Sequence, residues 1–256
     1  MGFLRELYDS FMEGIHEGEQ EWEETEKRRE EEKQKRIQPI SPRDEFLLKL
    51  KEIPYEEQFA LSIAAPFRVG FFGDWFTMFD DEPNRYDDLY PLHLFAFGRE
   101  GLMTEKDKKR LKKALKRDFD VKDSASSYQM IEEWWRWEGF ENWQKENKEY
   151  PVEVHIWMLS ALAYAVISFA DVGYISKGDA MPWLNKISAR WRLYGGNIKT
   201  ENPWSTFGMF LLIGDDMLKI NKGSHGKALE KYIGYLNTKP GSPWILVPFD
   251  TLGNLD

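Results

Sequence analysis

Carboxylates form the clearest clusters of chemically active side chains in this sequence. They gather as Asp80-Asp81-Glu82, Asp87-Asp88 and Asp215-Asp216. Carboxylate oxygens ligate magnesium and calcium, and two carboxyl groups with separated pKa values can perform acid–base chemistry. The spacing does not match the calcium loop of an EF-hand, and clusters of this kind are usually solvated loops. We therefore expect no metal site and no cofactor.

The residues that other common active sites require are absent or wrongly spaced. The chain has no cysteine, which excludes disulfides, thiolate nucleophiles and cysteine-ligated zinc. None of its four histidines lies three or four residues from another, so a helical zinc pair cannot form. The sequence also lacks the signatures of serine hydrolases, phosphate loops and dinucleotide sites. We predict no catalytic residue, and keep as the alternative an enzyme whose carboxylates are assembled from distant segments.

The N-terminal part of the chain differs in composition from the rest. It begins with one apolar stripe at helical spacing, formed by Phe3, Leu4, Leu7, Phe11 and Ile15. Residues 17–36 are almost all charged, with acids often four positions before bases, a pattern that stabilises exposed helices. We predict that residues 1–38 form an amphipathic and then charged helical arm, with a partly disordered arm as the alternative.

Residues 39–256 are predicted to form a single multi-helix globular domain. Apolar residues recur there at helical period and no useful length alternates with period two, which predicts an all-α fold. Polar residues near 138–151 mark a candidate subdomain seam, and Ile245-Leu246-Val247 is the only convincing β-like run.

Local signals predict where several helices begin and end. Thr104 and Asp107 have capping-box spacing and open a helix that should bury Leu111, Leu115 and Phe119. Pro66 is predicted to end a helix that begins near Glu56. Asp179 is predicted to cap a later helix, which places Pro182 in its first turn. A further helix is predicted over Trp204–Leu218, with Phe207, Phe210, Leu211 and Met217 as its apolar residues.

The longest apolar stretch, Ile156 to Ala170, is interrupted by serines and falls short of the roughly 20 residues that a membrane span needs. We therefore predict a buried helix from about Val152 to Asp171 and no membrane contact. Acids interrupt the N-terminus, which is unlike a secretory signal. Together with the lack of cysteine, this predicts a cytoplasmic protein.

The formal net charge of −9 favours basic protein partners and repels phosphate backbones. The basic run from Lys106 to Arg117 is the strongest nucleic-acid signal in the sequence. Lysines are nevertheless common on the outer face of an amphipathic helix, and no aromatic residues interleave with these to stack bases. Nucleic-acid binding through this helix is therefore only a third hypothesis.

Several groups of residues in the C-terminal half resemble the signatures of one protein family. They are Gly173-Tyr174-Ile175-Ser176 with Ala180 and Trp183, the run from Trp204 and Phe207 to Leu211 and Gly214, and Ser242-Pro243-Trp244. Upstream, Phe119-Asp120-Val121 with Tyr128 and Ile131 also fits. Over roughly Glu57 to Phe249, the chain resembles the bacterial domain-of-unknown-function family 1266. The resemblance implies a helical bacterial cytoplasmic protein and transfers no catalytic residue.

The absence of a catalytic motif, the acidic charge and the charged arm together favour a protein-binding module. We expect an immunity protein, or antitoxin, that neutralises a toxin domain by direct binding. Its expected partner is a basic toxin domain, with the one Trp of the charged arm as an interface anchor. The expected contact residues are Glu19, Trp22, Glu23, Arg28, Asp80, Asp81, Glu82, Asp87 and Asp88.

Overall fold

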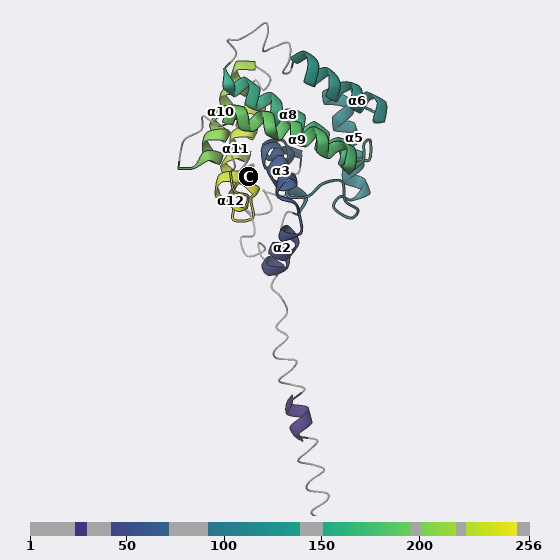
Figure 1. Cartoon of the computed structure of the whole chain (residues 1–256), viewed down its shortest axis with the longest axis vertical. Coiled ribbons are helices and arrows are strands. Elements are labelled where there is room, and N and C mark those ends of the chain that lie inside the picture. Colours follow the sequence, from purple (N-terminus) through teal and green to yellow (C-terminus); the bar gives the residue numbers. More distant parts are fainter. Residues whose placement is uncertain are drawn as a thin grey trace, which may run out of the picture. The chain divides into compact units, whose positions relative to one another are not determined.

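The computed structural model describes residues 24–29, 42–71, 92–138, 151–195, 201–218 and 224–249. The chain divides into two compact units, Met1–Ser41 and Pro42–Asp256. In the first unit, the described residues 24–29 form one short exposed helix. The second unit is built from helices, and no strand occurs in its described part (Figure 1). This confirms the predicted all-α fold class. The predicted seam near 138–151 lies almost wholly outside the described residues.

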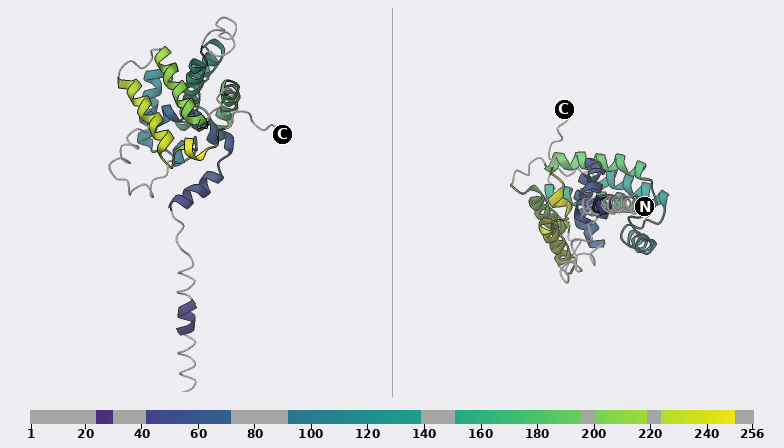
Figure 2. Two further views of the ribbon diagram at one scale, coloured as in Figure 1. Left: turned by 90° about the vertical axis from the view of Figure 1, so that its left-hand side faces the viewer. Right: turned by 90° about the horizontal axis from the view of Figure 1, so that it is seen from below.

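The second unit is organised around one apolar helix, α8 (Val152–Asp171), in which 17 of the 20 residues are buried. A helix that is apolar on every side must be covered on every side. The helices α3 (Tyr55–Phe71), α9 (Lys177–Gly195) and α10 (Pro203–Leu218) pack against it (Figures 1 and 2). Within the described chain, α8 alone is long and apolar enough to cross a membrane, yet 78% of its most apolar window is buried in the domain. Core helices of soluble proteins behave in this way.

The remaining described elements extend this central layer. The helices α5 (Glu105–Phe119) and α6 (Ser124–Glu133) contact α8, and a π-helical turn, η3 (Trp134–Glu138), follows α6. Thr104 caps α5 by accepting a hydrogen bond from the Asp107 N–H at 3.1 Å, as predicted. Leu111 and Leu115 are buried, as predicted, whereas Phe119 is only half-buried. The others are α2 (Pro42–Lys51), η2 (Leu92–Leu94), α11 (Ser224–Thr238) and α12 (Pro243–Leu246).

The helix α3 passes through Pro66 and continues to Phe71. Pro66 has no N–H to donate to the carbonyl of Ser62, one turn earlier. That carbonyl instead accepts a hydrogen bond from the indole Nε1 of Trp244, at 2.9 Å. Because the freed carbonyl has a buried partner, the helix is not interrupted, and the prediction that Pro66 ends it is wrong.

Two other predictions fail because a serine caps a helix. Ser176 Oγ accepts a hydrogen bond from the Asp179 N–H at 3.1 Å, so α9 begins at Lys177 and Pro182 lies inside the helix rather than in its first turn. Ser242 Oγ accepts from the Trp244 N–H at 3.1 Å, with Pro243 at the first helical position. The run 245–247, predicted as β-like, therefore begins within the short helix α12.

The three motifs that carry the family resemblance supply side chains to the core. Trp204 stacks on Trp244, with ring centroids 5.7 Å apart, and Phe207 meets the same Trp244 ring edge-on. Ala180, from the first motif, is also fully buried. Trp191, from α9, packs edge-on against Phe207 at 5.2 Å. Trp204 and Trp244, from two of the motifs, thus hold α10, α12 and α9 together with Trp191.

Candidate functional site

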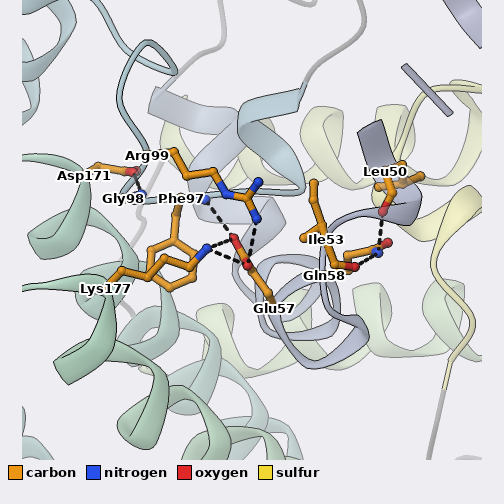
Figure 3. Close-up of polar contacts among 9 residues, drawn as sticks. All are labelled: Leu50, Ile53, Glu57, Gln58, Phe97, Gly98, Arg99, Asp171 and Lys177. Carbon is orange, nitrogen blue, oxygen red and sulfur yellow. Dashed lines mark hydrogen bonds and ion pairs between the residues drawn. The ribbon is translucent and has the colours of Figure 1, made fainter. Parts of the chain in front are cut away.

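The largest group of charged side chains in the core surrounds residues 94–99, which cross between α3, α8 and α9 (Figure 3). Residues 94–97 are buried, so their backbone needs hydrogen-bond partners inside the protein. Two carboxylates from distant helices supply them. Glu57 Oε1 accepts from the Phe97 N–H at 3.3 Å, and Asp171 Oδ1 accepts from the Gly98 N–H at 2.8 Å.

The Glu57 carboxylate is only 1% exposed and is surrounded by donors. Lys177 Nζ donates to both of its oxygens at 2.6 Å, and Arg99 lies 3.4 Å from Oε2. The Lys177 ammonium also lies 5.2 Å from the centroid of the Phe97 ring. The side chains of Lys177 and Arg99 are 29% and 38% exposed, so the two cations reach solvent while the carboxylate does not.

The second carboxylate, Asp171 at the end of α8, forms a buried ion pair. Arg68 donates to Asp171 Oδ2 at 2.6 Å, and both side chains are almost completely buried. Arg68 Nε also donates to the His93 carbonyl at 2.7 Å. Arg68 and Asp171 therefore bind the backbone at residues 93 and 98, and Glu57 binds it at residue 97. We call these three side chains, with Lys177 and Arg99, the clamp.

Gly98 is the point at which the clamp requires a glycine. Its φ is +58°, a conformation that residues with a Cβ rarely adopt. An added Cβ would also lie 3.3 Å from the Lys177 Cβ and 3.5 Å from the Ala170 Cβ. The glycine thus allows the chain to turn directly beside α8 and α9.

The clamp is suited to holding the chain in place rather than to catalysis. Each carboxylate already accepts hydrogen bonds from backbone N–H groups and from one or two cations of the same fold. A general base needs a lone pair that it can turn toward a substrate. Among the described residues, no group of three or more His, Asp or Glu side chains gathers to hold a metal ion.

The predicted contact residues fall mostly outside the part of the chain that the structure describes. Arg28 is described and is exposed on the helix over residues 24–29. The others lie outside the described residues: Glu19, Trp22, Glu23, Asp80, Asp81, Glu82, Asp87 and Asp88. The third acidic cluster is split by its helix. Asp215 is buried and accepts from Trp157 Nε1 at 3.1 Å, whereas Asp216 is exposed.

The structure also shows an apolar surface on α10 that the sequence analysis missed. Met209, Ile213 and Met217 are 55%, 44% and 47% exposed, and their spacing of four residues places them on one face of the helix. The opposite face buries Trp204, Phe207 and Leu211. The signal was present in the sequence, because α10 is apolar on both faces and one face must point outward.

Comparison with protein families, with curated proteins and with solved structures finds no match to this chain. The resemblance to the bacterial domain-of-unknown-function family 1266 stays a prediction.

One pH dependence follows from the surroundings of the clamp. Burial, together with the charge of Arg68, lowers the pKa of His93 to about 3. His93 thus stays neutral in the folded state, whereas the unfolded chain binds a proton below its ordinary pKa of 6.5. We expect His93 to lower the free energy of unfolding by about 1.4 kcal/mol for each unit by which the pH falls between pH 6 and pH 4.5.

Urea unfolding at several pH values would measure this slope. A His93→Phe variant is the control, and its slope should be smaller by about one proton. Burial and the charge of Arg190 also lower the pKa of His155. This adds a pH dependence of the same sign to the free energy of unfolding, and it is the same in the unmodified chain and in the His93→Phe variant. An unchanged slope in the variant would contradict the role of His93.

Proposed function

We propose that this chain is a protein-binding module, and more narrowly a bacterial cytoplasmic immunity protein that neutralises a toxin domain by direct binding. The observation that carries the proposal is the exposed apolar face of α10, formed by Met209, Ile213 and Met217. Water-exposed apolar side chains aligned on one face gain free energy when a partner covers them. Methionine suits such a surface, because its flexible side chain adapts to a partner.

The charge of the chain supports a basic partner. The net charge of −9 would accelerate association with a basic toxin domain. The clamp adds indirect support. Its buried carboxylates already accept hydrogen bonds from groups of the same fold, which suits a structural role better than catalysis. The alternative is an enzyme whose carboxylates come from distant segments, and Glu57 and Asp171 are two such carboxylates. Both, however, are held by donors of the protein itself.

The proposal is tested by capturing the partner and then measuring its affinity for variants. The full-length chain is used to isolate a stoichiometric partner from the native cytoplasm, and the purified partner is titrated against the triple variant Met209→Ser, Ile213→Ser and Met217→Ser. Loss of three apolar contacts at the centre of an interface is expected to weaken binding by roughly 100-fold or more.

The matched control is Leu48→Ser on α2, which removes an equally exposed apolar side chain from another helix. It should bind like the unmodified chain. Co-expression with the partner tests the narrower proposal, because an immunity protein should restore growth and the triple variant should not. A partner that binds the triple variant with undiminished affinity would remove α10 from the interface.

The arm around Trp22 and the loop over residues 80–88 stay predicted as further contacts of the same partner. The same titration with a chain lacking residues 1–38 separates the arm from α10.

A further inference from the structure

The exposed apolar face of α10 runs along the axis of the helix. Met209, Ile213 and Met217 span two turns and about 12 Å along the axis of the helix. Side chains repeating every fourth residue form a ridge, and the neighbouring row forms a groove that accepts the ridge of a second helix. An interface of this shape fits a partner helix with apolar side chains at positions i, i+4 and i+7.

On the side opposite its exposed face, α10 packs closely against the core. A Cβ on Gly214 would collide with the backbone of Glu153 in α8, and a Cβ on Gly208 would lie 3.2 Å from the Trp244 ring. The two glycines therefore allow α10 to lie directly on its neighbours. A surface that is fixed before binding loses little conformational entropy when a partner docks.

The one exposed charge of α10 is acidic. The helix contains Asp215, which is buried, and Asp216, which is exposed, and it has no Lys, Arg or His. Asp216 is exposed and lies seven residues after Met209, so it is on the apolar face itself. The adjacent helix α11 exposes both signs, with Lys227, Glu230 and Lys231. The exposed charge on the α10 face is therefore negative, whereas α11 carries charges of both signs.

These features favour one occupant over the others. A second copy of the chain would bring the same acidic face, so that like charges would meet across the twofold axis. Anionic lipid headgroups would be repelled by Asp216. A basic helix, in contrast, would place Lys or Arg beside Asp216 and its apolar side chains on the methionines.

We infer that α10 is the docking site for a basic amphipathic helix of the partner. The inference rests on the proposed function and narrows it, since it specifies the partner's contacting element and its charge. Asp216 sets the preference for a basic segment, and the apolar face supplies most of the affinity.

The probes are two designed 18-residue helical peptides with the same leucine stripe, one carrying lysines and the other glutamates at the flanking positions. Fluorescence anisotropy with the full-length chain gives both affinities in low and high salt. The lysine peptide is expected to bind at least about tenfold more tightly in low salt, an advantage that shrinks as salt screens the charges. The triple variant should lose binding, and Asp216→Lys should remove or invert the preference.

The charge control is Glu52→Lys, an exposed acid beyond α2, and the apolar control is again Leu48→Ser. Neither should change the two affinities. Binding of neither peptide, or a lysine preference that Asp216→Lys leaves intact, would overturn the inference. Equal binding of both peptides that still depends on the apolar face would overturn the basic-helix inference alone and leave the proposed function standing. Self-association that the triple variant abolishes would replace the partner helix with a second copy.

Discussion

Replacing Arg68 with Met is expected to lower the free energy of unfolding by about 3–5 kcal/mol. The substitution keeps most of the apolar volume but leaves Asp171 buried without its cation. It also removes the donor to the His93 carbonyl. An unpaired buried charge is far more destabilising than a missing surface ion pair. Urea denaturation followed by far-UV circular dichroism measures the effect.

The double variant Arg68→Met with Asp171→Asn shows whether the pair itself is responsible. Asparagine is uncharged and retains an oxygen that can accept from the Gly98 N–H. The double variant is therefore expected to be more stable than Arg68→Met alone. The exposed ion pair between Arg136 and Glu132 is the matched control. Replacing Arg136 with Met should lower the free energy of unfolding by less than about 1 kcal/mol. Simple additivity of Arg68→Met and Asp171→Asn would contradict a coupled pair.

Replacing Trp244 with Ala is expected to destabilise the protein by a similar amount, about 3–5 kcal/mol. The indole stacks on Trp204, contacts Phe207 and donates its N–H to the Ser62 carbonyl. The substitution therefore opens a cavity and leaves a buried acceptor unpaired. Thermal and urea unfolding of the variant, followed by circular dichroism, would measure both consequences together.

The contribution of the hydrogen bond alone can be separated with Trp244→Phe and Pro66→Ala. Trp244→Phe keeps an aromatic ring but removes the donor, which leaves the Ser62 carbonyl unpaired at about 1–3 kcal/mol. Pro66→Ala restores a backbone N–H to α3 that can reach this carbonyl. Trp244→Phe should therefore be less destabilising when Pro66→Ala is also present. Equal effects in both backgrounds would mean that the carbonyl does not depend on the indole.

The helices that could be predicted from the sequence are those determined by local patterns. The apolar stretch of α8 predicts burial whatever surrounds it, and Thr104 with Asp107 marks the start of α5 within one turn. The clamp could not be predicted in this way. Glu57 and Lys177 are 120 residues apart, and Arg68 and Asp171 are 103 apart, so no local spacing connects them.

Two outcomes could not be predicted because a distant partner determines them. Pro66 does not end α3 because Trp244, far along the chain, donates a hydrogen bond to the buried Ser62 carbonyl that Pro66 leaves without a backbone donor. Met217 points outward because Trp157 and the backbone of Glu153 occupy the other side of α10. Neither outcome follows from propensity, which describes only neighbouring residues.

The long sequence separation across the clamp also has a kinetic consequence. Contacts between residues more than 100 positions apart form only after long loops close, and loop closure opposes them until the surrounding helices have docked. The clamp is therefore expected to form after the folding transition state. Interactions formed that late act mainly on the rate of unfolding. The buried charges would then determine how long a folded molecule lasts rather than how quickly it folds.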